Sequence, residues 1–510
     1  MVNHYKVIKM KDINRILLIN PPNETTGHNT NYACFPHMGI VSLGTQVLKK
    51  YPHIDIRTAD GGIKSTDQIT SIIDSYRPDV LGISVLTPTY AEGLRIAEYA
   101  KRRYGSTIIL GDDHASFFPK VIMENRAFVD YIITNDVGEI PFILLIDALK
   151  SGADPSKVPS LVYRSKTEVI QTGEKTYSLG EVYAGYTDIP NLKLLGAEIK
   201  DYAKNYNEKF GRFHSDEVKP ITVNNARGCG NGKLRCTYCS INDLSINPGK
   251  PEQFWRTIEK YRDEGLNFFF EVCDSFGSFG AYINGLLKTM PFNPKEEGIE
   301  LMVYARAQDI ATKPALLDQF KKLNITRVNM GLDSGDAQTL ISQRKGNKRG
   351  HEVEVNTCAV TLLSKSGITI HASFIAGACG ETMETLGNTI DYMRLLMKEQ
   401  SFSSLEFSRH IPLPNSPSWD ILIGEENSFF YKHCGGIEKV LGSYDIALPP
   451  QVKTELREKY AHTDILNIDE LGKDWITHFT HLKHHEVSKT IEEMNKEIEA
   501  NNINTGNNVG

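Results

Sequence analysis

The 510-residue sequence has few cysteines, no long hydrophobic run and no strong excess of one charge. Its 8 cysteines are too sparse for the disulfide framework of a secreted protein. Apolar runs such as Phe142–Ile146 fall far short of the roughly 20 residues that cross a bilayer. The polar N-terminal segment lacks the hydrophobic stretch of a signal peptide. We therefore expect a cytosolic protein with no membrane partner.

Charge and composition exclude further classes of protein. Lys and Arg number 57 against 63 Asp and Glu, which gives a net charge of −6 and no global positive field for nucleic acid. Hydrophobic residues make up 40% and charged residues 24%, as in ordinary globular proteins. The length suits about three units at roughly 150 residues each. We expect a small-molecule substrate and no nucleic acid.

Residues 12–150 alternate between short β-rich runs and stretches of helical period. The expected strands are Arg15–Asn20, Ile54–Thr58, Asp79–Val85, Thr107–Leu110 and Asp130–Thr134. A capping box at 65–68 starts the helix after the second strand. This alternation predicts a doubly wound, Rossmann-like parallel sheet, which binds ligands at the carboxyl ends of its strands.

A second alternation follows a predicted linker over residues 151–219, in which a hairpin is expected near Leu161–Arg164. Its strands are expected from Ile221 and at Phe268–Val272, Glu300–Ala305, Arg327–Leu332, Ile368–Ile375 and Ser403–Ser408. These units predict a partial (β/α)6, TIM-like barrel over 220–416. A mainly helical cap over 417–500 and a disordered tail over 501–510 complete the predicted α/β protein.

Three cysteines, Cys229, Cys236 and Cys239, share one loop after the first predicted barrel strand. Three thiolates can bind three irons of a [4Fe–4S] cluster, and the missing fourth cysteine leaves one iron open to another ligand. A zinc knuckle is the alternative, although no nearby Cys or His completes its four ligands. An open iron favours chemistry over electron storage. The remaining cysteines singled out, expected to be buried small residues, are Cys34, Cys273, Cys358 and Cys379.

Over residues 12–416 the domain order and motifs resemble the cobalamin-binding-domain class of radical S-adenosylmethionine enzymes. In the first domain, 36–40 is similar to the family's Pro-x-x-Gly entry to helix one, and 111–116 to its Gly-Gly-Pro-His-Ala-Thr loop. In the barrel, 331–335 and 374–382 are similar to the Gly-x-Glu-Ser-Gly and Ile-x-Gly-x-Pro-Gly-Glu-Thr motifs. Each motif alone is weak evidence for this class of enzymes, whereas the occurrence of all of them in this order is strong evidence.

The resemblance implies a [4Fe–4S] cluster, S-adenosylmethionine and cobalamin as cofactors. The implied S-adenosylmethionine contacts are Tyr238, Asp274, Arg306 and Asp333. The implied cobalamin contacts are Ser84, Thr87, Gly111, Asp112, His114, Gly138 and Glu139. Structural roles are the alternatives: a turn aromatic for Tyr238, helix caps for the strand-end carboxylates Asp274 and Asp333, an ion pair for Arg306 and a loop hydrogen bond for His114.

The activity implied is methyl transfer to an unactivated carbon, or to phosphorus, of a small molecule or natural-product intermediate. It would use a 5′-deoxyadenosyl radical and methylcobalamin, with electrons from a donor such as flavodoxin or ferredoxin. A radical rearrangement, ring contraction or oxidation without methyl transfer is the second hypothesis. A non-catalytic corrin-binding or iron–sulfur electron-transfer protein is the third, and the open iron argues against it.

The chain departs from the family's pattern at several points. The cluster loop exceeds the usual Cys-x3-Cys-x2-Cys spacing by three residues within Gly230–Arg235, where Lys233 and Arg235 face either the substrate or solvent. Asp333 replaces a Glu, and Ala378-Cys379 replace the x-Pro pair. The first helix region lacks the Asp-x-His-x-x-Gly motif, so no axial histidine is expected from it. Near the C-terminus, one helix is expected to present a solvated face or, alternatively, a metal site through His478, His481, His484 and His485.

Overall fold

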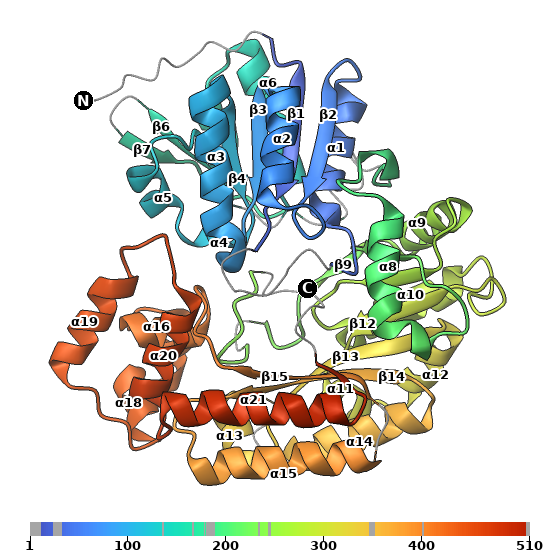
Figure 1. Cartoon of the computed structure of the whole chain (residues 1–510), viewed down its shortest axis with the longest axis vertical. Coiled ribbons are helices and arrows are strands. Elements are labelled where there is room, and N and C mark those ends of the chain that lie inside the picture. The colour runs from blue at the N-terminus through green and yellow to red at the C-terminus, as the bar shows by residue number, and fades with distance from the viewer. Residues whose placement is uncertain are drawn as a thin grey trace. The chain divides into compact units, whose positions relative to one another are not determined.

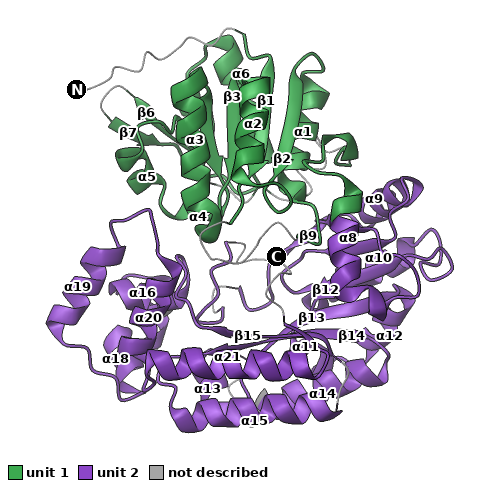
Figure 2. Ribbon diagram, viewed as in Figure 1, with its two compact units in different colours: residues 1–201 green, residues 202–510 purple. Residues whose placement is uncertain are grey.

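The computed structural model describes residues 12–23, 33–134, 137–165, 168–177, 179, 189–232, 235–242, 246–345, 352–399 and 402–505. The chain divides into two compact units, residues 1–201 and 202–510 (Figure 2). The segment 151–219, predicted as a linker, is thus divided between the two units. Within the described residues, no helix is long and apolar enough to cross a membrane.

The first unit is built on a 7-stranded sheet in the order β2-β1-β3-β4-β5-β6-β7 (Figure 1). Strands β1 to β5 are parallel, and the hairpin β6–β7 adds two antiparallel strands to one edge. The strands are β1 Arg15–Asn20, β2 Asp55–Asp60, β3 Val80–Ser84, β4 Thr107–Gly111, β5 Tyr131–Ile133, β6 Leu161–Ser165 and β7 Glu168–Gln171. The predicted doubly wound sheet is confirmed, and the predicted hairpin belongs to it.

Helices flank the first sheet in two pairs, α1 with α6 and α2 with α3. Helix α2 begins with the predicted capping box, in which Gln68 N donates to Ser65 Oγ at 3.3 Å and Ser65 N to Gln68 Oε1 at 2.9 Å. Because β1 lies between β2 and β3, the connections leaving β1 and β3 diverge, and doubly wound sheets bind ligands at such a point. The helices are α1 Met38–Lys50, α2 Thr66–Tyr76, α3 Tyr90–Tyr104, α4 Asp113–Phe117, α5 Pro119–Asn125 and α6 Glu139–Ser151.

The second unit contains another 7-stranded sheet, in the order β16-β15-β14-β13-β12-β11-β8, with every pair parallel. Its main strands are β8 Pro220–Val223, β11 Phe268–Glu271, β12 Glu300–Tyr304, β13 Ile325–Asp333, β14 Thr369–Ala376 and β15 Phe402–Arg409. They follow one another along the sheet in chain order, as a partial barrel requires. The predicted fold class is confirmed.

Part of the predicted disordered tail is instead ordered. Asn504–Thr505 form β16, which pairs with the edge of β15. The Asn504 side chain donates to the carbonyl oxygens of Lys209 at 2.7 Å and Ser403 at 3.0 Å. The edge of β15 offers unpaired backbone groups that the sequence pattern could not reveal. Residues 506–510 lie outside the described part of the chain.

Helices connect and cover the strands of the second unit, and the last helix, α21, lies along β15 (Figure 1). These helices are α8 Ile199–Phe210, which begins in the first unit, α9 Pro251–Asp263, α10 Gly280–Thr289, α11 Ala307–Thr312, α12 Ala315–Lys322, α13 Ala337–Ser342, α14 Glu352–Lys365 and α15 Met383–Glu399. After the barrel come α16 Pro417–Ile423, α17 Phe429–Cys434, α18 Ile437–Gly442, α19 Pro450–Tyr460, α20 Ile468–Phe479 and α21 His484–Ala500. A two-stranded ribbon, β9 Ala226–Arg227 with β10 Asn247–Pro248, precedes α9.

Two predictions about single residues are wrong. Cys358 is exposed, because the buried side of α14 is formed by Asn356, Ala359 and Val360. The four C-terminal histidines do not share a helix: α20 ends at Phe479, and His481 lies before α21 begins. In the described ranges, no three His, Cys, Asp or Glu side chains converge as ligands of one metal ion.

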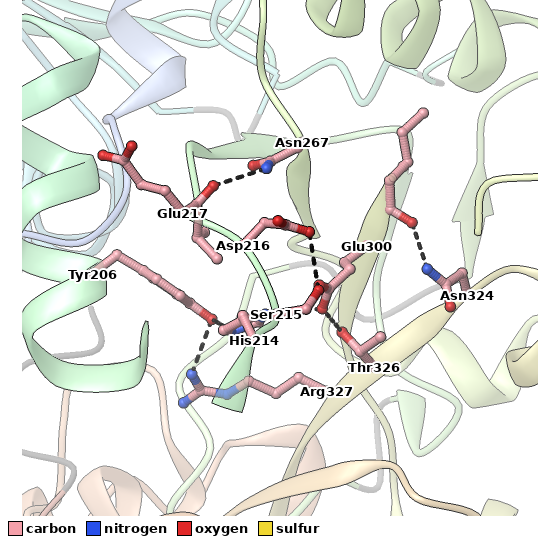
Figure 3. A network of polar contacts seen from close by, with 12 residues as sticks. Tyr206, His214, Ser215, Asp216, Glu217, Asn267, Glu300, Asn324, Thr326 and Arg327 are labelled. Carbon is pink, nitrogen blue, oxygen red and sulfur yellow. Dashed lines mark hydrogen bonds and ion pairs between the residues drawn. The ribbon is translucent and has the colours of Figure 1, made fainter. Parts of the chain in front are cut away.

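A polar network closes the amino end of the second sheet (Figure 3). Glu300, the first residue of β12, accepts from Thr326 Oγ1 at 2.7 Å and lies 2.9 Å from His214 Nδ1. The other ring nitrogen of His214 lies 3.1 Å from the Tyr206 hydroxyl, to which Arg327 Nη1 donates at 3.4 Å. Arg327 is 2% exposed, and its guanidinium lies over the Phe210 ring at 4.0 Å. This end of the barrel is therefore filled by side chains.

Candidate active site

The cysteine loop follows β8 and the short strand β9 at the carboxyl end of the second sheet. Gly232 N donates to Cys229 O and Cys239 N to Cys236 O, each at 3.1 Å, so two tight turns shape the loop. The pKa of Cys239 is raised to about 12, mainly by burial, and the nearby thiols of Cys236 and Cys229 act in the same direction. The three sulfurs thus lie within electrostatic range of one another. Binding of a metal cluster would release the thiol protons.

The donors around the loop fit a [4Fe–4S] cluster held by three thiolates. Each thiolate of such a cluster binds a different iron, so the sulfurs need not meet at one point. Asn231 Nδ2 donates to Cys236 Sγ at 3.7 Å, a contact that stabilises a thiolate. Cys273, which follows β11, instead donates to the carbonyl oxygen of Gly228 at 3.7 Å.

Arg306 lies against the cysteine loop at the start of α11. A Cβ atom on Gly230 would lie 2.8 Å from Ser278 Oγ and 3.1 Å from Arg306 Nη1, so a larger residue there would require these side chains to shift. Burial raises the pKa of Cys229, and the positive charge of Arg306 opposes this effect. Arg306 Nε is 3.9 Å from Asp309 Oδ2, which makes only a loose ion pair. The Arg306 guanidinium therefore interacts more closely with the cysteine loop than with the Asp309 carboxylate.

Asp274 also belongs to this end of the sheet, directly after β11. Its carboxylate accepts a hydrogen bond from Gly228 N at 3.0 Å and so tethers the residue before Cys229. The short helical turn that follows is capped at Ser275, one residue later. Asp274 thus binds the cysteine loop instead of capping a helix.

Tyr238 and Asp333 meet in a group that includes an unpredicted lysine. Tyr238 donates to Asp333 Oδ2 at 2.8 Å, and Lys345 Nζ lies 2.5 Å from the same oxygen. Lys345 Nζ also lies 3.3 Å from the Tyr238 hydroxyl. Burial lowers the pKa of Lys345, but the charges of Asp333 and Cys236 outweigh it and keep the amine protonated. No spacing in the sequence distinguishes Lys345 from its charged neighbours.

The backbone at Asp333 explains its position. Its φ is 64°, a left-handed conformation that is unusual for a residue other than glycine. The register between β13 and β14 shifts between Gly331 and Asp333, as at a β-bulge. A Cβ atom on Gly331 would lie 2.9 Å from Lys345 Nζ and 3.0 Å from Asp333 Oδ1. The bulge therefore turns the Asp333 carboxylate toward Lys345.

His410 is a second residue that the sequence did not reveal. It follows β15, stacks on Trp475 at 4.7 Å and meets the edge of the Tyr238 ring at 6.4 Å. Burial lowers the pKa of His410 to about 3, so its ring is neutral. Its Nε2 lies 3.0 Å from Ser418 Oγ, whereas its Nδ1 is buried without a hydrogen-bond partner in the structure. In the described part of the chain, the neutral His410 ring beside Tyr238 thus has one nitrogen without a hydrogen bond.

The inserted part of the cysteine loop is anchored by Arg235. Its guanidinium donates to Ile241 O at 2.6 Å and to the carbonyl oxygen of Asn415. The first C-terminal helix reaches the same loop, because Ser418 N and Oγ both donate to Thr237 O at 2.8 Å. Arg235 thus holds backbone carbonyls instead of pointing freely to solvent. Lys233 lies outside the described residues.

In the first unit, the predicted cobalamin contacts gather at the carboxyl ends of β3 and β4. Ser84 pairs in register with Gly111, and Ser84 Oγ donates to Asp112 Oδ2. Asp112 has a φ of 78° and caps α4. His37 Nε2, from the segment before α1, lies 3.4 Å from Ser84 Oγ. This edge therefore presents small and polar groups, including a histidine that was not predicted as a contact.

His114 occupies a different environment from these residues. It is completely buried, with its ring 4.1 Å from that of Tyr90, and its Nδ1 lies 3.1 Å from Thr87 Oγ1. Gly138 precedes α6, and Glu139 accepts from Ser42 Oγ at 2.9 Å. The neighbouring loop residues 135 and 136, part of the predicted ligand edge, lie outside the described residues.

The sequence is similar to a known protein family and to several known proteins. Residues 224–393 match the family model described as the Radical SAM superfamily. An uncharacterized methyltransferase of Pyrococcus horikoshii is 23% identical over 420 residues, which cover 80% of this chain and 83% of the relative. The anaerobic magnesium-protoporphyrin IX monomethyl ester cyclase of Rubrivivax gelatinosus is 25% identical over 345 residues, 65% of this chain and 56% of the cyclase.

A solved structure shares the fold across both units. The radical S-adenosylmethionine methyltransferase TsrM from Kitasatospora setae, determined with cobalamin and a [4Fe–4S] cluster bound, aligns with a TM-score of 0.64 at 17% identity. The alignment covers 82% of this chain and 76% of TsrM. At this identity the similarity shows the fold.

Proposed function

We propose that this chain is a cobalamin-dependent radical S-adenosylmethionine enzyme that methylates an unactivated carbon, or phosphorus, of a small molecule. The observation that carries the proposal is the loop of Cys229, Cys236 and Cys239 at the carboxyl end of the partial barrel. That loop lies within the region that matches the Radical SAM superfamily and leaves one iron of a cluster open. The fold shared with TsrM and the methyltransferase name of the Pyrococcus relative support methyl transfer.

The second unit supplies the residues for the iron–sulfur centre and S-adenosylmethionine. When bound, the cluster and S-adenosylmethionine supply a one-electron cleavage that yields an organic radical, and cobalamin supplies a methyl carrier. Asp274 and Arg306 fix the cysteine loop, while Asp333, held by Lys345, would bind S-adenosylmethionine beside Tyr238. A flavodoxin or ferredoxin is the expected electron source.

The first unit would hold cobalamin over the ends of β3 and β4. Among the described residues, a Cβ atom on Gly111 would have only the Ile133 carbonyl oxygen within 4 Å, at 3.9 Å. Ser84 and Asp112 would contact the corrin or its nucleotide tail from this edge. His114 packs into the core, so we infer that its role is to hold Thr87 in place.

A second candidate function is a radical cyclisation or rearrangement without methyl transfer. The similarity to the Rubrivivax cyclase favours it, although this chain spans about half of that protein. The two functions share the cluster and S-adenosylmethionine and differ in the fate of the methyl group. That difference makes them separable by experiment.

The test is anaerobic reconstitution with iron, sulfide and hydroxocobalamin, followed by reduction in the presence of S-adenosylmethionine with a deuterated methyl group. We expect optical signatures of both cofactors, formation of 5′-deoxyadenosine and deuterated methyl on the bound corrin by mass spectrometry. Formation of 5′-deoxyadenosine without corrin binding would contradict methyl transfer and favour the second candidate. A variant with Cys229, Cys236 and Cys239 replaced by Ala should lose the cleavage activity.

A further inference from the structure

The strands of the partial barrel have one polar face and one apolar face. In the registers of β12 to β15, Tyr304 lies opposite Asn329, Asn329 opposite His371 and His371 opposite Ser404. Two residues further along each strand, Ser373 lies opposite Glu406. Since side chains alternate along a strand, the intervening residues point to the other face, where the structure buries Val303, Val328, Met330, Ala372, Leu405 and Phe407.

The residues of the polar face differ in exposure. Asn329, His371 and Ser404 are buried in one row of the register, and Arg327, which belongs to the network of Figure 3, lies two residues before Asn329 on β13. Tyr304, at the β12 end of this row, and Glu406, two residues beyond Ser404 on β15, are partly exposed. A ligand on this face would therefore enter from the end that carries the cysteine loop.

Glu406 differs from two other acidic residues of the barrel in lacking a partner. Glu271 accepts hydrogen bonds from Asn225 N at 3.1 Å and Ala226 N at 3.3 Å. Glu381 accepts from Gly377 N and from Ala378 N at 3.2 Å. Both carboxylates thus fix backbone turns. In the part of the chain that the structure describes, Glu406 makes no hydrogen bond or ion pair, and burial raises its pKa.

Tyr304 connects Glu406 to the cysteine loop. Burial raises the pKa of Tyr304, a hydrogen bond with Asn329 opposes this, and the charges of Asp274 and Glu406 raise it further. Tyr304, Asn329, His371 and Ser404 form one row across β12 to β15, and Glu406 lies two residues beyond Ser404, so Tyr304 and Glu406 share a face of the sheet. Asp274 binds Gly228 of the cysteine loop at 3.0 Å. Glu406 therefore lies on the polar face, beyond the buried row and toward the strand ends that carry the cysteine loop.

We propose that Glu406 binds a protonated amine of the substrate, with Tyr304 as a second polar contact. The substrate is accordingly a small molecule with a primary or secondary amine, an inference that rests on the proposed radical function of this barrel. A carboxylate that is partly removed from water loses part of its hydration, and a cation or donor compensates this loss. An ammonium group compensates its charge and donates the missing hydrogen bonds. Among the described residues, the Glu406 carboxylate caps no turn and closes no hydrogen-bond network.

The test is ligand-observed NMR with the reconstituted holoenzyme and a library of small primary amines, each paired with the alcohol of the same shape. We expect amines to bind in preference to their alcohols. Glu406→Gln, which keeps the shape and removes the charge, should weaken amine binding at least about tenfold. Glu399→Gln, the same change at an exposed residue of α15, serves as the matched control and should bind like the parent.

Equal binding of amines and alcohols, absence of amine binding, or amine binding that persists in Glu406→Gln would each overturn the assignment. Circular dichroism and iron content establish that the variant is folded and loaded. The experiment needs no electron donor and no turnover. A failure of methyl transfer would therefore leave the binding result intact, and a failure of amine binding would leave the cleavage assay of the proposed function intact.

Discussion

Lys345 Nζ lies 2.5 Å from Asp333 Oδ2, and the same carboxylate oxygen accepts the hydroxyl of Tyr238 at 2.8 Å. Asp333 is 1% exposed and holds a left-handed backbone at the end of β13. The lysine therefore neutralises a buried charge that the bulge directs toward the cysteine loop. Because Tyr238 stands between Cys236 and Cys239 in the chain, this pair also orients the loop.

We predict that Lys345→Met destabilises the second unit, because it leaves a buried carboxylate without its cation. The expected loss is about 3 kcal/mol in the free energy of unfolding. Lys345→Met combined with Asp333→Asn should recover part of this loss, since neither charge then remains. Urea denaturation of the unloaded protein measures both effects.

The matched control is Lys453→Met, which removes the exposed partner of Glu438 and should cost no more than about 1 kcal/mol. Equal losses in Lys345→Met and Lys453→Met would show that the Asp333 pair is not a buried charge pair in solution.

Arg306 should tune the redox potential of the bound cluster. Its guanidinium lies near Gly230 and opposes the raised pKa of Cys229, so it places positive charge beside the thiolates. A positive charge favours the reduced, more negative cluster. Arg306→Met should therefore lower the midpoint potential by roughly tens of millivolts, as measured by paramagnetic resonance during a redox titration. Arg102→Met, an exposed change in the first unit, should leave the potential unchanged.

Iron binding should depend on three of the eight cysteines. Replacing Cys229, Cys236 and Cys239 together with Ala should abolish the cluster absorption and reduce the iron content from about four atoms per chain to background. Cys358→Ala changes an exposed cysteine outside the loop and should keep the full iron content. Four irons in the triple variant would refute the assignment of the ligands.

Strand positions could be predicted closely because hydrophobic periodicity is a local property. β1 was expected at Arg15–Asn20 and is found there, and the other predicted strands differ at their ends by a few residues. β16 was missed, since a two-residue strand has no period and exists only because β15 offers an edge. The four C-terminal histidines were placed on one helix because the break after Phe479 carries no Pro or Gly.

The site was predictable only where its residues form a motif. Cysteine spacing indicated Cys229, and the family resemblance implied Asp333, without any knowledge of contacts. Lys345 and His410 reach Tyr238 from distant parts of the chain, through a bulge and a stacked tryptophan respectively. Glu406 could not be predicted from the sequence either, because it is distinguished by the lack of a partner among the described residues.

The second unit should lose stability as the pH rises toward 8. Burial raises the pKa of Glu381 from 4.5 to about 8, against the opposing hydrogen bonds from Gly377 and Ala378. Between about pH 4.5 and about pH 8, Glu381 therefore keeps its proton in the folded chain and has lost it in the unfolded chain. The stabilisation is fully present below about pH 4.5 and is lost as the pH passes through about 8. Glu271, whose pKa burial also raises to about 8, acts in the same direction.

Glu381→Gln mimics the neutral acid and should flatten this dependence. We expect the unfolding free energy of the parent protein to fall by roughly 1–4 kcal/mol between about pH 5 and about pH 8, and that of the variant to fall less. Urea denaturation of the unloaded chain at several pH values provides the measurement. Glu399→Gln, at an exposed site, should keep the parental slope; if Glu381→Gln keeps it too, Glu381 is already ionised in the folded chain.

The first unit should bind cobalamin without a histidine on the cobalt. The sequence lacks the Asp-x-His-x-x-Gly motif, His114 is enclosed by Tyr90 and Thr87, and His37 Nε2 faces Ser84 at 3.4 Å. After reconstitution with hydroxocobalamin and reduction to cobalt(II), the paramagnetic resonance spectrum should show cobalt hyperfine lines without nitrogen splitting. Asp112→Ala should weaken corrin retention on gel filtration, because it removes the acceptor of Ser84 at the strand ends.

Nitrogen splitting in that spectrum would identify an axial imidazole, and His37 is the candidate that the fold offers. Its Nδ1 is buried without a partner in the structure, and its contact with Ser84 is long enough to exchange for a metal bond. His37→Ala would then remove the splitting, whereas His53→Ala, which changes a histidine beyond the end of α1, would keep it. Loss of corrin retention in the parent protein would instead remove cobalamin from the proposed function and leave the radical rearrangement.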